Sequence, residues 1–95
     1  MVVLAVTWIA KAGAEQAVAD LFRKLQSESR KEPGCRFYQV HTHRNDPRRF
    51  FIYEQYEDDA ALQAHRDSRH FQELAAKKLA QIAERQAGDL YQPVD

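Results

Sequence analysis

The first apolar run of the chain, Val2–Ile9, places the strongest limit on its fold. The run is rich in β-branched residues, and apolar side chains occupy both of its alternating sets of positions. A strand of this kind is buried on both faces, so it belongs in the interior of a sheet that is covered on both sides. The 95 residues make one domain, residues 1–95, with a core of marginal size. The fold must therefore supply two covering layers for one small sheet.

Two stretches have the spacing of amphipathic helices. Apolar residues from Ala14 to Arg30 form one stripe, and Pro33-Gly34 ends this helix. The second stretch begins after Asp58-Asp59, whose carboxylates suit a helix N-terminus. Ser68-Arg69-His70 interrupts it and supplies a serine cap for the next helical segment. Helical spacing then continues from Phe71 to Ala83, and Gly88 is expected to end the helix.

The remaining segments predict three further strands. Cys35–Arg44 and Phe50–Glu57 flank the turn-forming sequence Asn45-Asp46-Pro47-Arg48, as in a hairpin. A short last strand, Asp89–Val94, is expected at a sheet edge because Pro93 has no N–H to donate. The resulting order, β-α-β-β-α-β, is the ferredoxin-like split β-α-β pattern, an α+β fold with an antiparallel sheet.

In this fold both helices cover the same face of the sheet. The other face would then expose the aromatic side chains of Phe51 and Tyr53, which is unusual for a soluble monomer. We therefore expect a homodimer in which the open sheet faces pack together, an assembly of the dimeric α/β barrel type.

The charge balance excludes some partners. Lys+Arg and Asp+Glu number 14 each, and the sequence pI is near 6.9, so no basic surface for nucleic acid is expected. The apolar start, Val2–Ala10, is too short to span a bilayer and lacks the features of a signal peptide. We therefore expect a cytoplasmic protein with no nucleic-acid or membrane partner. The single cysteine, Cys35, cannot form an intramolecular disulfide and is interpreted as a small packed residue.

Two residues are candidates for acid–base chemistry. His65 lies beside the apolar stripe of its helix, and a histidine, whose ordinary pKa is about 6.5, can accept a proton near neutral pH. Its alternative role is structural, as a capping or buried histidine that bonds a backbone carbonyl. Glu54 shares a strand face with Ile52 and Tyr56, so it needs a partner or a raised pKa if the helices cover that face. Its alternative role is an ion pair with an arginine.

Several other residues have both a binding and a structural interpretation. Tyr38 and Tyr56 can line a pocket or simply pack in the core. His70 and Phe71 lie at the helix break, where they form either a pocket mouth or a helix start with a core anchor. His41 and His43 lie on one strand face, a geometry that can bind metal, but no third ligand has a telling spacing. We expect no metal.

The chain as a whole resembles the antibiotic biosynthesis monooxygenase family, and within it the small quinol monooxygenases. The resemblance covers nearly the whole chain and is carried by motifs that occur in order at matching spacing. These are Glu32-Pro33-Gly34-Cys35 with Tyr38, Asp46-Pro47 with Phe50, Glu54-Gln55-Tyr56, Asp58 with Ala60-Ala61 and Ala64-His65, and Ser68-Arg69-His70-Phe71. The family often has Trp in place of Tyr56 and Pro in place of Arg69. Haem-degrading relatives use an Asn and a Trp where this chain has Thr7 and Tyr56.

The resemblance implies an enzyme that oxygenates quinol-like or polyphenolic aromatics with dioxygen and needs no flavin, haem or metal cofactor. It implies His65 and Glu54 as catalytic residues, and substrate contacts from Tyr38, Tyr56, His70, Phe71 and Thr7. The protein would supply an apolar, water-poor pocket and a group that takes a phenolic proton. Two alternatives remain open: a non-oxygenase binding protein or isomerase on the same dimeric scaffold, and a haem-binding or haem-degrading relative.

Overall fold

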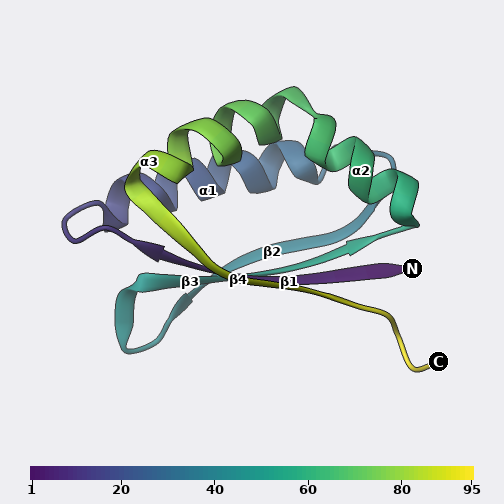
Figure 1. The fold of residues 1–95 in the computed structure, drawn as a ribbon, viewed down its shortest axis with the longest axis horizontal. Helices are drawn as coiled ribbons and strands as arrows, with labels where there is room; N and C mark the ends of the chain where they lie inside the picture. Colours follow the sequence, from purple (N-terminus) through teal and green to yellow (C-terminus); the bar gives the residue numbers. More distant parts are fainter.

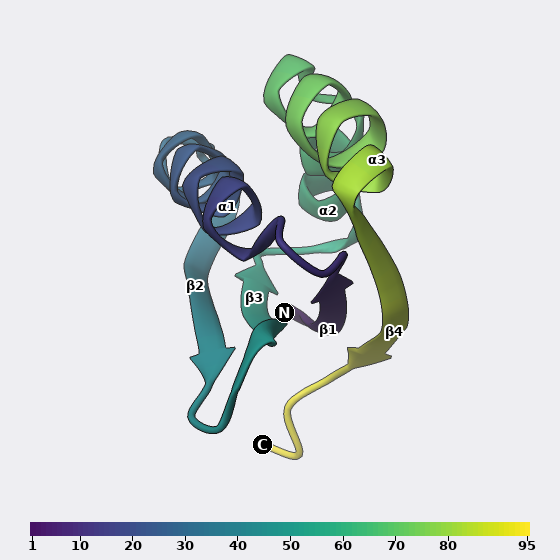
Figure 2. The ribbon, with the colours of Figure 1, turned by 90° about the vertical axis from the view of Figure 1, so that its left-hand side faces the viewer.

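The computed structural model of the protein describes every residue, Met1–Asp95, and has an α+β fold of the ferredoxin-like kind. Four strands form one antiparallel sheet in the order β2-β3-β1-β4. The helices all lie on one face of this sheet, and the other face is open (Figures 1 and 2). The elements are β1 (Val2–Ala10), α1 (Glu15–Ser29), β2 (Cys35–His43), β3 (Asp46–Tyr56), α2 (Asp59–Asp67), the π-helix η1 (Phe71–Leu79), α3 (Ala80–Ile82) and β4 (Ala83–Tyr91).

The predicted caps are present and fix where the helices begin. The Asp58 carboxylate accepts a hydrogen bond of 2.8 Å from the Ala61 N–H at the start of α2. The Ser68 hydroxyl accepts from the Phe71 N–H at 3.2 Å and donates to the His65 carbonyl at 2.6 Å. This serine therefore joins the end of α2 to the start of η1, which sets the position of both His65 and Phe71.

The last strand differs from the prediction. β4 begins at Ala83 rather than Asp89, so Gly88 lies inside the strand instead of ending a helix. Pairing with β1 explains the difference, because Ala83 pairs with Ala10 and seven further pairs follow it. This pairing outweighs the helix propensity of the segment. The strand does lie at a sheet edge, as expected, but Pro93 follows it and is not the cause.

The hairpin is also tighter than predicted. β3 begins at Asp46, and only Arg44 and Asn45 form the turn. Pro47 fits inside β3 because the pairing of β3 with β1 starts two residues later, at Arg49.

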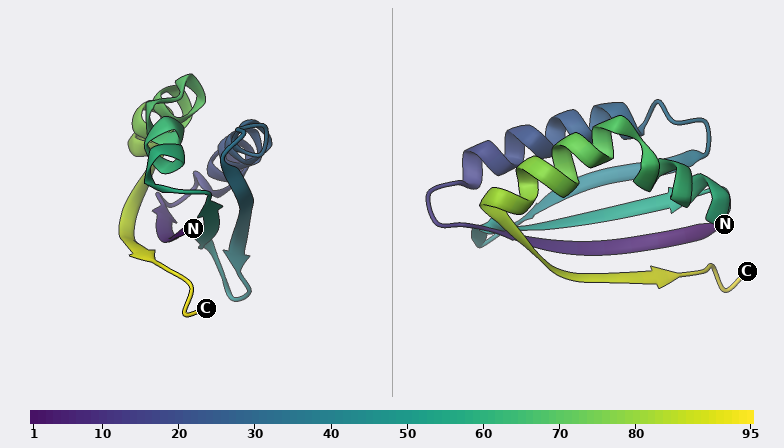
Figure 3. Two further views of the ribbon diagram at one scale, coloured as in Figure 1. Left: turned by 90° about the vertical axis from the view of Figure 1, so that its right-hand side faces the viewer. Right: turned by 45° about the horizontal axis from the view of Figure 1, so that its top comes forward.

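Strand alternation separates a buried face from an open one. The face under the helices carries Phe50, Ile52, Glu54 and Tyr56 from β3, all buried. α1 packs Val18, Phe22 and Leu25 against this face. The covering helices divide into two, with α1 over the β2 side and α2, η1 and α3 over the β4 side (Figures 2 and 3). No helix has the length and apolar character that a membrane crossing requires.

Candidate active site

A small cavity of about 60 Å³ lies between the sheet and the helices. Most of its lining is apolar and comes from β1, α1, β3 and η1. The polar groups that reach it are one carboxylate, one imidazole, one phenol and two guanidinium groups. The lining residues are Leu4, Val6, Trp8, Phe22, Leu25, Tyr38, Ile52, Glu54, His65, Arg66, Phe71, Ala75 and Arg85.

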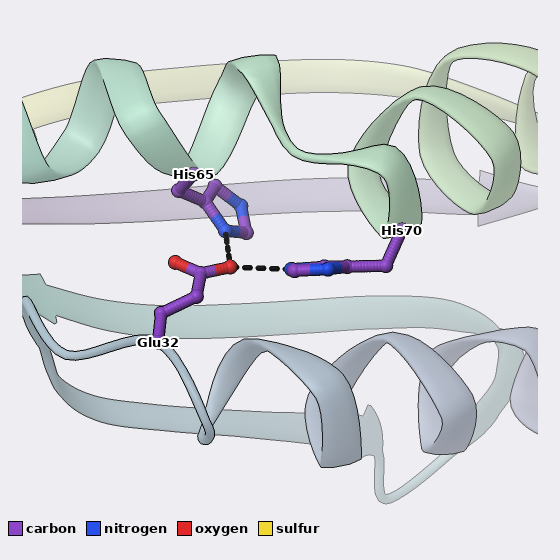
Figure 4. A group of neighbouring side chains, drawn as sticks. All are labelled: Glu32, His65 and His70. Atoms are coloured by element: carbon purple, nitrogen blue, oxygen red, sulfur yellow. Dashed lines mark hydrogen bonds and ion pairs between the residues drawn. The ribbon is translucent and has the colours of Figure 1, made fainter.

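His65 is the imidazole in this cavity, and only 2% of its side chain is exposed. Its Nδ1 lies 2.8 Å from Oε2 of Glu32, a residue of the loop that follows α1. Nε2 of His70 hydrogen-bonds to the same carboxylate oxygen, so the Glu32 carboxylate lies between the two imidazoles (Figure 4). A neutral His65 that donates its Nδ1 proton to Glu32 has its lone pair on Nε2. Glu32 therefore orients His65 with Nε2 available as a proton acceptor.

The other side of His65 faces Glu54. Nε2 of His65 lies 3.7 Å from Oε1 of Glu54, and the Tyr56 hydroxyl donates a 2.5 Å hydrogen bond to that same oxygen. Burial raises the pKa of Glu54, and the hydrogen bond from Tyr56 and the nearby His65 only partly oppose this rise. The buried carboxylate has a tyrosine as its partner, not the arginine of the alternative interpretation. His65 and Glu54 thus form a facing base and acid in a largely apolar cavity.

Aromatic rings surround His65. The ring centroids of Tyr56 and Phe71 each lie 5.1 Å from that of His65, and the centroid of Tyr38 lies at 5.9 Å. Burial raises the pKa of both tyrosines, so their phenols stay neutral at physiological pH. Tyr38 and Phe71 line the cavity, whereas Tyr56 contacts it only through Glu54 and His65. The structure therefore brings together most of the residues that the sequence proposed.

Thr7 is the exception among the proposed residues. It alternates with Val6 and Trp8, which both line the cavity, so the pleat of β1 directs Thr7 to the open face of the sheet. His41 and His43 also lie outside the site. His41 contacts the Phe51 carbonyl, and His43 accepts from the Asn45 N–H.

Cys35 is not an activated thiol. Burial, helped by the nearby Glu32, raises its pKa to about 11. Its thiol donates a weak hydrogen bond of 3.6 Å to the Phe37 carbonyl. Because the thiolate is the nucleophilic form, this raised pKa disfavours nucleophilic chemistry at Cys35 near neutral pH.

Sequence reasoning did not propose Glu32, Trp8 or the two arginines as site residues. Glu32 lies in a loop, where no periodicity marks which side chains turn inward. Its only signal was its place at the start of the Glu-Pro-Gly-Cys motif. Arg85 was assigned to a helix, and its true strand position is what directs it to the cavity.

Glu32, His65 and His70 are also the residues that would hold a metal ion. Their potential ligand atoms all lie within 4.8 Å of one another, and two imidazoles with one carboxylate suit a divalent transition metal. Oε1 of Glu32 is buried without a hydrogen-bond partner, whereas Oε2 accepts from both histidines. Hydrogen bonds therefore satisfy Oε2 of this carboxylate and leave Oε1 without a partner.

Glu54→Gln is expected to raise stability at pH 8 by about 1 kcal/mol and to leave it nearly unchanged near pH 4. Burial makes the pKa of Glu54 higher in the folded protein than in the unfolded chain. The resulting contribution to stability is fully present below the unfolded pKa, and it is lost as pH rises through the folded pKa. The amide has no charge to bury, and its oxygen still accepts from Tyr56. Urea unfolding across this pH range measures the difference. Glu84→Gln, at an exposed position, is the matched control, and equal pH profiles for both variants would contradict the prediction.

Both the sequence and the fold are similar to those of known proteins. The profile of the antibiotic biosynthesis monooxygenase family matches residues 1–77. A crystal structure of an antibiotic biosynthesis monooxygenase is 28% identical, with a TM-score of 0.88 and 100% of both chains covered.

Two further solved structures are similar over nearly their whole length. PA3566 from Pseudomonas aeruginosa is 32% identical, with a TM-score of 0.83 and coverage of 97% of this chain and 90% of its own. A protein from Nitrosomonas europaea, provisionally named an antibiotic biosynthesis monooxygenase, is 25% identical, with a TM-score of 0.92 and 100% of both chains covered. We found no match among curated proteins. The chain belongs to the antibiotic biosynthesis monooxygenase family.

Proposed function

We propose that this protein is a cofactor-independent monooxygenase that oxidises quinol-like or polyphenolic aromatics with dioxygen. The observation that supports this most is the environment of His65. Glu32 holds its Nδ1, so Nε2 is available as a base in an apolar cavity, opposite the buried acid Glu54. An electron-rich quinol supplies its own reducing electrons, so the protein needs only to remove a proton and exclude water.

The proposed reaction begins when a quinol hydroxyl gives its proton to Nε2 of His65. The resulting anion passes one electron to dioxygen, and the substrate radical and superoxide then combine at a ring carbon. Loss of water from this adduct leaves one oxygen atom on the ring, and a dihydroxynaphthalene becomes a hydroxynaphthoquinone. Burial raises the pKa of Glu54, which makes its carboxyl a suitable group to give a proton to the departing oxygen.

Isomerisation is the second candidate, because a facing acid and base without a redox group also suit proton transfer between two positions of one substrate. The haem alternative has less support. One of the two positions that haem-degrading relatives use is Thr7, which lies on the face of the sheet away from the cavity.

Oxygen labelling separates these functions. The protein is incubated with dihydroxynaphthalenes under ¹⁸O₂, and oxygen consumption is measured with autoxidation subtracted. A monooxygenase places one labelled atom in the product and the other in water. Consumption no faster than the uncatalysed rate with every hydroxylated naphthalene or benzene tried would favour the binding-protein or isomerase function.

We expect the purified protein to carry no stoichiometric flavin, haem or metal, because the proposed reaction needs none. Absorption from 350 to 600 nm tests for the first two, and elemental analysis tests for metal. One metal per subunit would contradict the proposal. Glu32→Gln and His70→Ala would then show whether Glu32, His65 and His70 hold it, and His43→Ala, in the exposed hairpin, is the control.

A further inference from the structure

We infer that the aromatic ligand of the cavity carries a carboxylate, which Arg85 of β4 and Arg66 of α2 bind at the solvent side of the cavity. The substrate class is therefore a hydroxylated aromatic acid. This inference rests on the proposed function only for the reaction of the aromatic ring. The binding of the carboxylate does not depend on turnover.

The two arginines share a place at the cavity, and their guanidinium groups have no partner within the chain. Both line the cavity; Arg85 is exposed and Arg66 half-buried, so they line it from its solvent side. α2 and β4 lie on the same side of the molecule (Figure 3). The guanidinium groups of Arg66 and Arg85 form neither a salt bridge nor a hydrogen bond, as is also true of several surface cations, but only these two of them line the cavity. A guanidinium offers a planar fork of donors that matches a carboxylate.

The backbone of β4 places Arg85 toward the cavity by an irregularity in its pairing. Trp8 pairs with Arg85 and Thr7 pairs with Ala87, so Gln86 is an extra residue in the ladder. Such a bulge changes the direction of the side chains beside it. Residues 85 and 88 are three apart and would face opposite sides of a regular strand. Here Arg85 pairs with Trp8 and Gly88 pairs with Val6. Both of these β1 residues line the cavity, so positions 85 and 88 both belong to the cavity face.

Gly88 leaves the space that the Arg85 guanidinium occupies. A Cβ at position 88 would lie 2.2 Å from a terminal nitrogen of Arg85 and 2.7 Å from the guanidinium carbon. Gly88 has no positive φ, so alanine is compatible with the backbone there and only the arginine must move. The bulge and the glycine together hold the guanidinium over the cavity face of β4.

The charges in the cavity set the orientation of the ligand. The positive charge of Arg85 reaches Glu54, since it opposes the rise in the pKa of this carboxyl. A ligand carboxylate therefore lies best beside Arg85 and Arg66 and away from the carboxylate of Glu32. The ring then occupies the apolar interior, with a hydroxyl toward Nε2 of His65. Binding of the carboxylate by the arginines thus positions the hydroxyl at the other end of the ligand against Nε2 of His65.

The test compares an acid with its neutral counterpart under nitrogen. Titration calorimetry gives the affinities of 1-hydroxy-2-naphthoate and 1-naphthol, neither of which needs to react. The indole N–H resonance of Trp8, the single tryptophan and a cavity residue, shows by NMR that each ligand enters the cavity. We expect the acid to bind at least about tenfold more tightly, since a hydrogen bond to a charged group contributes enough for such a difference.

Two variants make the assignment specific. Arg85→Gln should lower acid affinity by about 10–100-fold and leave 1-naphthol binding unchanged. Gly88→Ala should displace the guanidinium and reduce the preference for the acid although Arg85 is still present. Arg66→Gln should have a smaller effect in the same direction. Arg23→Gln, on the exposed face of α1, is the control and should change neither affinity.

The outcomes separate this inference from the proposed function. Equal affinities for the two ligands, no cavity binding of either, or a preference that survives both Arg85→Gln and Gly88→Ala would overturn the inference. A preference for the acid without any catalysed oxygen consumption would overturn the monooxygenase proposal and leave the carboxylate site standing. Oxygenation of neutral quinols at the same kcat/KM as acidic ones would support the monooxygenase proposal and overturn the carboxylate site.

Discussion

His65→Ala is expected to lower oxygen-dependent quinol turnover by about 10²–10⁴-fold, the usual contribution of a positioned general base. His65 carries the only imidazole that lines the cavity, and its Nδ1 contacts Glu32, which leaves Nε2 to accept the proton. Without it the quinol must ionise unaided in an apolar site. Initial rates from an oxygen electrode, with autoxidation subtracted, give the loss.

The fold of the variant must be checked, because His65 is more buried than the sequence suggested. With 2% of its side chain exposed, its truncation leaves a space beside Tyr56 and Phe71 and costs about 2–3 kcal/mol. His65→Gln is therefore the better variant. It retains hydrogen bonding but has no basic nitrogen near pH 7.

The two variants separate proton transfer from positioning. If the base role is right, His65→Gln should be nearly as inactive as His65→Ala while its thermal unfolding stays close to that of the wild type. His43→Ala, which removes an exposed imidazole from the hairpin, should keep full activity. A correctly folded His65→Gln protein that turns quinol over at the wild-type rate would show that His65 is not the base.

Periodic patterns made most of the fold predictable. The two-residue period of β3 placed Ile52, Glu54 and Tyr56 on one face, and the helical spacing of α1 and α2 placed that face beneath them. From this alone, a buried carboxylate under the helices followed, and the resemblance to the family assigned it to the same site as His65. The structure adds the orientation of each side chain, and above all the hydrogen bond that Tyr56 donates to Glu54.

The failures have a common physical cause, which is dependence on contacts far apart in the sequence. Residues 83–88 have helix-forming composition, yet pairing with β1 makes them a strand. Arg85 could not be placed at the cavity until that pairing, with its bulge, was known. Glu32 lies 33 residues from His65 in the sequence, and no local pattern links a loop carboxylate to a helix imidazole. Thr7 was assigned to the site because haem-degrading relatives use the corresponding position, and not by the alternation of its strand, which directs it to the other face.

Dimer formation is the other property for which we expect a large effect of mutation. We expect the wild-type protein to be a homodimer through the open sheet face, which carries aromatic side chains that the chain itself leaves uncovered. Phe37 and Phe51 are 46% and 40% exposed, and Phe37 packs edge-to-face on Tyr53 with 5.6 Å between ring centroids. Large aromatic surfaces of this kind are typical of interfaces between subunits. Sedimentation equilibrium at micromolar concentration should give about twice the chain mass of 11.0 kDa.

Phe51→Glu is expected to abolish the dimer. Facing copies would bring two unpaired carboxylates into an apolar contact, and a buried unpaired charge costs several kcal/mol. The sedimentation mass should fall to that of one chain, or the protein should unfold because its small core is no longer covered on both sides. Ala64→Glu, which adds the same charge at an exposed position of α2, should leave the dimer intact. A wild-type protein that sediments only as an 11.0 kDa species would end the proposal, whereas a Phe51→Glu dimer of wild-type affinity would place the interface elsewhere.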